Sequence, residues 1–204
     1  MNVLVIAPHA DDEVLGVGGT VHKYKEAGHK IYLVVCSKRA HDIDYSHAHG
    51  NFEKVLNIEL PDEHLYKFKN ELVKNIEIFY NDIKPEVVFI PNKDDFNMDH
   101  KTVYEVCEVL CRRFQQHQPR KVLMYEIPSS TTQSFNNNFH CNYYETLSED
   151  NLNNKIGIFY QYKSEIRNEP NPRNSKGIMA YALFRGMECN NGLAEGFKLI
   201  YQKS

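Results

Sequence analysis

The sequence lacks the features that would assign the protein to a membrane or to a nucleic acid. Its 24 lysines and arginines stand against 27 aspartates and glutamates, so the formal net charge is only −3. The absence of a basic excess and of a polybasic block argues against binding to nucleic acid or to a membrane surface. No apolar run approaches the roughly 20 residues that span a bilayer, so we expect no transmembrane segment.

Signs of secretion and of a disulfide framework are also missing. The N-terminus begins within a strand-like segment, without the charged and apolar stretches of a signal peptide. The five cysteines show no CxxC spacing, which fits buried thiols in a reducing compartment. We therefore expect a cytoplasmic protein. The 204 residues contain no internal repeat and predict a single domain over residues 1–204.

What the chain does contain is an alternation of strands and helices. Short apolar runs predict strands at 2–6, 31–36, 57–60, 86–90 and 121–126. Helical spacing and the intervening lengths predict helices at 13–27, 46–56, 63–83, 100–116, 148–166 and 175–188, and a last strand near 197–201. This alternation predicts an α/β fold, a Rossmann-like three-layer sandwich with a mostly parallel central sheet.

Two polar clusters follow predicted strands. "APHADDE" comes after the first strand, and "PNKDDFNMDH" comes after the strand at 86–90. In open parallel sheets ligands bind beyond the carboxyl ends of the strands. Both clusters are therefore expected at the same rim of the sheet.

Together the two clusters offer the ligands of a catalytic metal. His9 and Asp12 lie three residues apart in a strand-to-helix turn, and His100 would begin a helix on the same rim. Two imidazoles and one carboxylate form the three-ligand set of a catalytic zinc, with a position left for water, although Fe²⁺ or Co²⁺ would also suit them. Asp11 cannot point the same way as Asp12 and could act on that water as a general base.

Each cluster alone has a simpler interpretation. Acidic residues commonly cap helices and occupy their first turn, and a single histidine at a helix start is usually no ligand. The conjunction of both clusters at one edge is what favours a metal site. A dinucleotide site is not favoured, because Gly16, Gly18 and Gly19 do not form GxGxxG directly after the strand.

The sequence resembles the PIG-L/LmbE-like zinc-dependent N-deacetylases, an N-acetylglucosaminyl deacetylase-like family. "PHADDE" and "NMDH" are similar to the PHPDDE and HxxDH motifs of that family, and "GGT", "VLMYEIPSST" and "FRGMECNNGLAEGF" extend the likeness over most of the chain. The resemblance implies a single LmbE-like deacetylase domain over 1–204. It also implies zinc ligands at His9, Asp12 and His100, with Asp11 as the base.

The reaction implied by the resemblance is removal of an N-acetyl group from an amino sugar or sugar conjugate by metal-activated water. The expected setting is glycoconjugate biosynthesis in the cytoplasm. The expected partner is a small N-acetylated sugar or nucleotide-sugar substrate. The chain could also form a homo-oligomer. The alternatives are a metal-dependent phosphoesterase and a catalytically inactive sugar- or nucleotide-binding relative.

The chain departs from the family pattern at Ala10, in place of a proline, and at Asn97. Asn97 stands where the family usually has a histidine that stabilises an oxyanion or protonates the leaving amine, with Asp99 orienting it. An asparagine amide can donate a hydrogen bond to an oxyanion but cannot supply a proton. Asn97 and Asp99 are therefore candidate catalytic residues, and Asp11 would have to act as both base and acid.

Substrate contacts are less defined. The arginine–glutamate pattern of the family is not evident in "IDYSHAHGNFEK". This region contains Arg39, His41, His47 and His49. They could bind a phosphate or a carboxylated sugar, or they could belong to a solvated loop. Glu13 could hydrogen-bond a ligand or stabilise the helix dipole. Asp94 or Asp95 could line the metal site, and Tyr125 and Glu126 could face the pocket. Arg185 and Glu195 could form a structural ion pair or contact the substrate.

Overall fold

The structure is a computed structural model that describes residues 1–38, 50–114, 116–135 and 139–204. Its strands are β1 (Asn2–Ala7), β2 (Lys30–Lys38), β3 (Lys54–Pro61), β4 (Val87–Pro91), β5 (Lys121–Tyr125), β6 (Tyr143–Thr146) and β7 (Ala194–Gln202). Its α-helices are α1 (Asp12–Glu26), α2 (Lys69–Ile83), α3 (Met98–Leu110), α4 (Glu149–Phe159) and α5 (Ser175–Glu188). Short 3₁₀ turns lie at Leu65–Phe68, Thr131–Gln133 and Lys163–Glu165.

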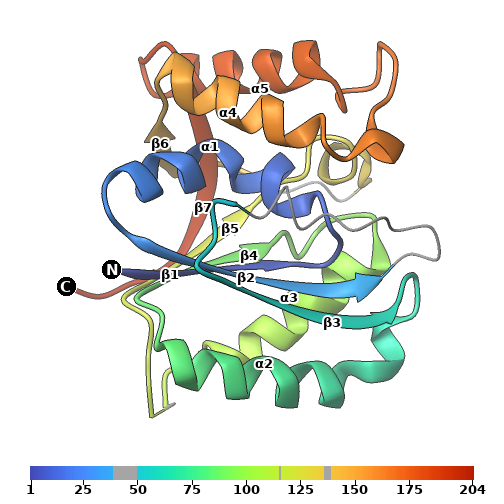
Figure 1. Ribbon diagram of the computed structural model, residues 1–204, viewed down its shortest axis with the longest axis vertical. Coiled ribbons are helices and arrows are strands. Elements are labelled where there is room, and N and C mark those ends of the chain that lie inside the picture. Colours follow the sequence, from blue (N-terminus) through green and yellow to red (C-terminus); the bar gives the residue numbers. More distant parts are fainter. Residues whose placement is uncertain (39–49, 115, 136–138) are drawn as a thin grey trace.

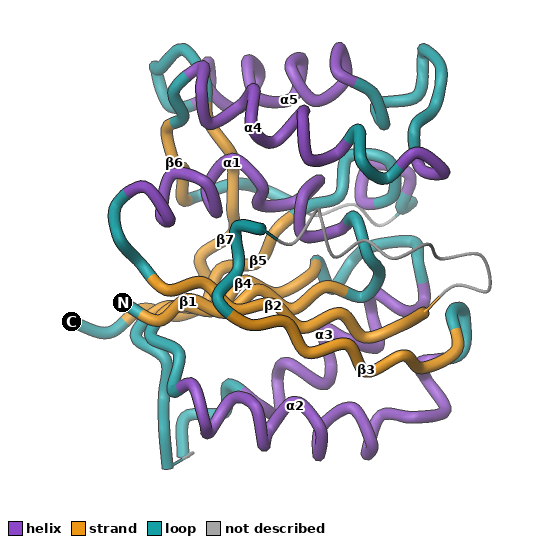
Figure 2. The backbone as a smooth tube through the Cα atoms, in the orientation of Figure 1, coloured by secondary structure: helices purple, strands orange, loops and turns teal. Residues whose placement is uncertain are grey.

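The strands form one sheet in the order β3-β2-β1-β4-β5-β7-β6. The first five in this order pair in parallel, whereas β7 runs antiparallel to both β5 and β6. Helices α1, α4 and α5 cover one face and α2 and α3 cover the other (Figures 1 and 2). The three-layer α/β fold with a mostly parallel sheet, as predicted, is confirmed. The order reverses at β1, between β2 and β4, and in such sheets this switch point is where ligands bind.

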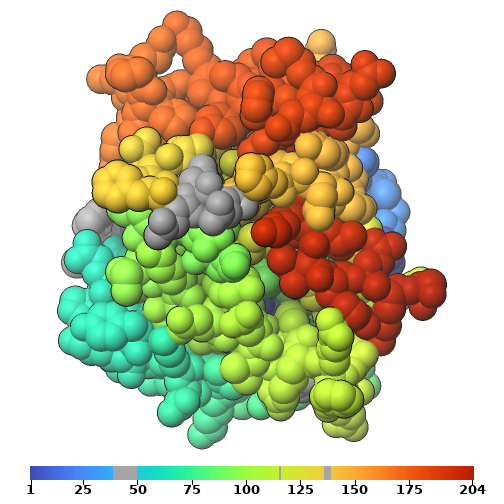
Figure 3. Space-filling model, turned by 180° about the vertical axis from the view of Figure 1, so that it is seen from behind, coloured from blue at the N-terminus to red at the C-terminus, as the bar shows by residue number. Residues whose placement is uncertain are grey.

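The central strand β1 is buried on both faces because its apolar side chains alternate between two cores. Val3, Val5 and Ala7 belong to the core beneath α1, and Leu4 and Ile6 belong to the core beneath α2 and α3. All residues of β1 after Asn2 are buried, and the view from behind shows the blue N-terminal part of the chain mainly at one edge (Figure 3). The polar turn that follows β1 therefore starts from a rigid element.

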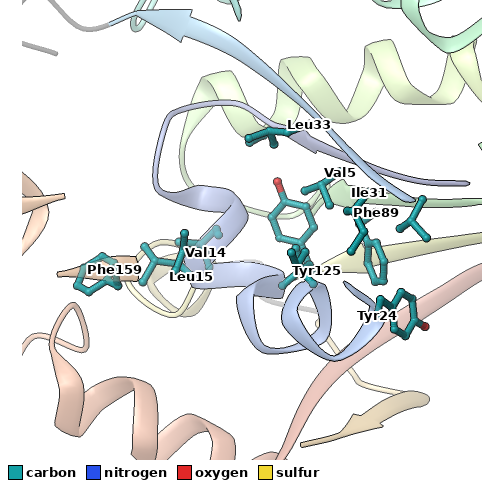
Figure 4. Packing of buried hydrophobic residues seen from close by; sticks show 14 of the residues in the cluster. Val5, Val14, Leu15, Tyr24, Ile31, Leu33, Phe89, Tyr125 and Phe159 are labelled. Carbon is teal, nitrogen blue, oxygen red and sulfur yellow. The ribbon is translucent and has the colours of Figure 1, made fainter. Parts of the chain in front are cut away.

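Helix α1 packs closely on the sheet through Tyr125. The ring of Tyr125 lies between the sheet face and α1 (Figure 4), and its hydroxyl donates to the carbonyl of Ile6 at 2.8 Å. A Cβ added at Gly16 would come within 2.3 Å of the Tyr125 ring, so only glycine permits this approach. The start of α1 is thereby fixed over the end of β1.

One predicted helix is wrong. Residues 54–56 of the helix expected at 46–56 belong to β3, while 46–49 lie outside the described residues. The pairs Leu33–Val55 and Val34–Leu56 join β3 to β2 in parallel. Pairing with a neighbouring strand satisfies the backbone of this segment, which outweighs the local spacing of its side chains.

Other predicted elements have shifted ends. The expected 100–116 helix is α3, which ends at Leu110, and the expected 148–166 helix is α4, which ends at Phe159. The strand β6 is not among the predicted strands, although it pairs with β7 over residues 143–146. None of the helices in the described ranges combines the length and the apolar composition that crossing a bilayer requires.

Candidate metal centre

The turn after β1 separates two neighbouring carboxylates. Asp11, the N-cap of α1, has φ 106° and ψ −27° in the left-handed region, which is uncommon for a residue with a side chain. Its carbonyl accepts the N–H groups of Val14 and Leu15 at 3.1 and 2.9 Å. With the backbone fixed in this way, the side chain of Asp12 folds back and accepts the backbone N–H of His9 at 3.0 Å.

The same turn and the start of α3 bring three potential ligand atoms together. Nδ1 of His9 lies 3.0 Å from Oδ2 of Asp12, and Nε2 of His100 lies 3.2 Å from that oxygen and 3.3 Å from Nδ1 of His9. Atoms bonded at about 2.0–2.1 Å to a tetrahedral zinc ion lie about 3.3–3.4 Å apart. The triangle formed by the three residues therefore fits one metal ion. All three are at most 3 % exposed.

The second nitrogen of His9 faces two carboxylates. Nε2 lies 2.9 Å from Oδ1 of Asp62 and 3.4 Å from Oδ2 of Asp99. Carboxylates in this position hold the proton on Nε2 and leave the lone pair of Nδ1 for a metal. Asp62, which follows β3, was not predicted, because no motif links it to the two polar clusters.

His100 also has a carboxylate beside its second nitrogen. Its Nδ1 lies 3.2 Å from Oδ2 of Asp95. This fully buried carboxylate also accepts the hydroxyls of Ser130 and Thr131 at 2.9 and 2.7 Å and the N–H of Asn97 at 2.9 Å. Of the two aspartates that were candidates to line the site, Asp95 is the one the structure brings to His100.

The carboxylates favour positive charge at this point. Burial by itself lowers the pKa of His100, but the charge of Asp12 and hydrogen bonds to Asp12 and Asp95 raise that pKa to about 9. Burial opposes charge at His9 too, and hydrogen bonds to Asp12, Asp62 and Asp99 raise its pKa well above 6.5. Burial would raise the pKa of Asp12, yet the two imidazoles lower it.

Asp62 and Asp99 lie together beside the second nitrogen of His9. The three residues are close enough to share an ion. However, the N–H of Glu63 donates to Oδ2 of Asp99 at 2.7 Å and to Oδ1 of Asp62 at 3.0 Å. The two carboxylates therefore share one backbone donor, and their position beside Nε2 suits them to orient His9.

Asn97 and Asp99 have structural partners that the sequence did not reveal. Oδ1 of Asn97 caps α3 by accepting the N–H groups of Asp99 and His100 at 2.8 and 3.4 Å. The carboxylate of Asp99 accepts the N–H groups of Glu63 and Leu65 and faces His9, so it orients that imidazole. The orienting role expected for Asp99 is thus directed at His9 in the structure.

Asp11 faces a different part of the chain. The guanidinium of Arg173, from the turn before α5, contacts Oδ2 of Asp11 and lies 3.3 Å from Oε2 of Glu165. Burial lowers the pKa of Arg173 to about 10, which leaves the side chain charged at neutral pH. No motif marks Arg173, and the surrounding "NEPNPRNS" has the composition of a linker.

Other candidate residues make structural contacts. Glu13 accepts the N–H of Asp11 at 3.0 Å and the hydroxyl of Tyr162. Tyr125 is a core residue. The expected ion pair of Arg185 and Glu195 is wrong, because Arg185 pairs with Glu126 and Glu195 pairs with Lys155 at 2.6 Å. The remaining candidates lie outside the described residues, namely Arg39, His41, His47 and His49.

The fold and this site define a doubly wound α/β protein with a His₂Asp cluster suited to one metal ion at its topological switch point. Residues 4–111, which carry all three cluster residues, match the family model described as PIG-L, GlcNAc-PI de-N-acetylase. The chain belongs to the PIG-L family.

Solved structures share the whole fold at low sequence identity. The conserved protein TT1542 from Thermus thermophilus aligns with a TM-score of 0.79 and 18 % identity, covering 99 % of this chain and 96 % of that one. The N,N'-diacetylchitobiose deacetylase from Pyrococcus horikoshii aligns with a TM-score of 0.74 and 16 % identity, covering 98 % of this chain and 83 % of that one. The 4-carboxy-2-hydroxymuconate hydratase GalB from Pseudomonas putida aligns with a TM-score of 0.77 and 16 % identity, covering 100 % of this chain and 97 % of that one. Since one fold carries a deacetylase and a hydratase, the reaction has to be argued from the site.

Proposed function

We propose that this protein is a metal-dependent amidohydrolase that removes an N-acetyl group from an amino sugar or sugar conjugate. The observation that carries the proposal is the buried triangle of Nδ1 of His9, Oδ2 of Asp12 and Nε2 of His100, with sides of 3.0–3.3 Å. Membership of the PIG-L family and the likeness to a chitobiose deacetylase support the choice of substrate class.

Zinc is the metal that these ligands suit best, with Fe²⁺ or Co²⁺ as alternatives. A bound ion of this kind acidifies a coordinated water and polarises a carbonyl oxygen. His9 and His100 would bind it as neutral imidazoles, each with its other nitrogen held by carboxylates. Asp12 would supply the one anionic ligand.

Proton transfer falls to Asp11. Its carboxylate would take the proton of the attacking water and later deliver it to the leaving amine, since Asn97 has no proton to give. Oδ1 of Asn97 is engaged in capping α3. Its amide nitrogen is therefore the group that would donate to the developing oxyanion.

A metal-dependent phosphoesterase is less well supported. Such enzymes commonly hold two ions about 3.5–4 Å apart between bridging carboxylates. Among the described residues, the carboxylates around the triangle are directed at its imidazoles, Asp62 and Asp99 at His9 and Asp95 at His100. This arrangement favours one ion.

The proposed substrate is a small N-acetylated sugar or nucleotide sugar, used in glycoconjugate biosynthesis. We also propose a single domain over 1–204 that works in the cytoplasm. All five cysteines fall within the described residues and are free thiols, which supports a reducing compartment.

Metal analysis of the purified protein, combined with a screen for amine release, tests the proposal. The panel contains N-acetylglucosamine, N,N'-diacetylchitobiose, nucleotide-linked N-acetyl sugars and, as a control, a phosphate monoester. We expect one metal ion per chain and a new primary amine from at least one N-acetyl sugar. A metal-loaded protein that releases amine from none of them, or that hydrolyses the phosphate monoester instead, would overturn the proposal.

A further inference from the structure

We propose that Arg173 is a positioning residue that holds the carboxylate of Asp11 in the orientation the reaction needs. This inference rests on the proposed function, in which Asp11 transfers the proton. It adds a residue from the C-terminal half of the chain, outside the family match at 4–111.

The contact joins a fully buried side chain to a half-buried one across more than half of the sequence. The side chain of Asp11 is fully buried and that of Arg173 is 17 % exposed, and the Nη2 atom of Arg173 contacts Oδ2 of Asp11. The same Nη2 lies 3.3 Å from the buried carboxylate of Glu165. One cation therefore lies between two buried acids, an arrangement that is costly to break from either side.

The turn that carries Arg173 is held by its own hydrogen bonds. The N–H of Arg167 donates to the carbonyl of Arg173 at 2.9 Å, and the amide of Asn174 donates to the carbonyl of Arg167 at 3.2 Å. Asn174 also caps α5 by accepting the N–H of Gly177 at 3.0 Å. A Cβ at Gly177 would come within 2.2 Å of the carbonyl oxygen of Pro172, so the turn packs directly on α5.

The turn after β1 meets this C-terminal segment at two points. Tyr162 donates to Glu13, whose other carboxylate oxygen accepts the N–H of Asp11 at 3.0 Å. Arg173 contacts the side chain of the same Asp11. The backbone and the carboxylate of Asp11 are thus fixed separately, the first through Glu13 and the second through Arg173.

The carboxylate of Asp11 needs this second support. A carboxylate on a fixed backbone can still rotate about its side-chain bonds, and a general base has to lie within hydrogen-bond reach of the proton it takes. A guanidinium on one oxygen selects one rotamer and sets the direction of the second oxygen. Removing it should slow turnover without weakening substrate binding.

Kinetics of Arg173→Gln and Arg173→Lys test this, with Arg167→Gln as the matched control. Arg167 lies in the same turn, and its side chain approaches Glu165 at 3.7 Å and is 47 % exposed. On the N-acetyl sugar that the wild type hydrolyses, we expect Arg173→Gln to lower kcat by about 10- to 100-fold, as for other orienting residues. KM and metal content should remain near the wild-type values, Arg173→Lys should recover part of kcat, and Arg167→Gln should be unchanged.

Thermal unfolding supplies a readout that is independent of activity. In a cycle of wild type, Arg173→Gln, Asp11→Asn and the double variant, the double variant should lose less in Tm than the sum of the single losses. Additive losses, or an unaltered kcat in Arg173→Gln, would overturn the positioning role while leaving the proposed function intact. Wild-type protein that releases no amine would overturn the function, and the cycle would still decide whether Arg173 holds Asp11.

Discussion

The carboxylate of Asp99 links His9 to a segment of the chain that contains no ligand. Its Oδ2 lies 3.4 Å from Nε2 of His9, and its two oxygens accept the N–H groups of Glu63 and Leu65 at 2.7 and 3.1 Å. Three segments that are distant in sequence, the ends of β1 and β3 and the start of α3, therefore meet at one acidic side chain.

Replacing Asp99 by asparagine should weaken metal binding. The amide can accept only one of the two N–H groups through its oxygen and would turn its NH₂ group towards the other donor, and such a mismatch costs about 1–3 kcal/mol. We expect metal affinity to fall by about 10- to 100-fold, measured by competition with a chelator. Asp94→Asn is the matched control, because Asp94 is only half-buried and its carboxylate lies 3.9 Å from Nζ of Lys93. Equal metal affinity in the two variants would show that Asp99 does not support the site.

His100→Ala should abolish stable metal retention. Two remaining ligands, His9 and Asp12, rarely hold zinc, which in catalytic sites takes three protein ligands. The measurement is the metal content after dialysis. The control is His22→Ala, since His22 lies in α1 and is not one of the three ligands. Unchanged metal content in His100→Ala would rule out His100 as a ligand.

Asp11→Asn should keep the metal and lose most turnover. The amide has nearly the same shape but cannot accept the proton, and loss of a general base costs about 100- to 10,000-fold. Metal content and kcat are the two measurements. If the variant turned over substrate at the wild-type rate at pH 7, the base would have to be another residue.

The metal-free protein should lose stability as the pH rises from neutral towards 9. The pKa of His100 is raised from 6.5 to about 9 in the folded state. Its contribution to the stability of the fold is therefore fully present below about pH 6.5 and is lost as the pH rises past about 9. The raised pKa of His9 acts in the same direction, and the lowered pKa of Asp12 adds stability that is lost at acid pH. Tm of the metal-free protein from pH 6 to 10 tests this.

Adding zinc should change that profile. Metal binding requires neutral imidazoles, so it becomes stronger at higher pH, and the Tm difference between zinc-loaded and metal-free protein should widen over the same range. A constant difference would mean that zinc does not bind at His9 and His100.

Gly16→Ala should destabilise the protein by displacing Tyr125. The new methyl group would lie 2.3 Å from the ring, which is itself fully buried, and overpacking of this kind costs about 1–3 kcal/mol. Gly157→Ala in α4 is the matched control, because a Cβ there meets no atom within 4 Å. The control should be neutral or stabilising by up to about 1 kcal/mol, as measured by denaturant unfolding.

The sequence by itself determined the elements whose patterns are local. The apolar runs of β1, β4 and β5 and the helical spacing of α1, α2 and α5 are complete within each segment, so they predict the α/β fold. Parallel strands share one carboxyl edge. Because His9, Asp12 and His100 follow two such strands, their positions in the chain are enough to place them at the same rim.

Only the tertiary structure decided the features that depend on a distant partner. Val55 and Leu56 became part of a strand because β2 was beside them, and β6 formed against β7, which is far from it in the sequence. Three further residues acquired their roles through contacts with His9, His100 and Asp11, namely Asp62, Asp95 and Arg173. No local pattern encodes such contacts, because they depend on how complete helices and strands pack and not on the residues next to them in the chain.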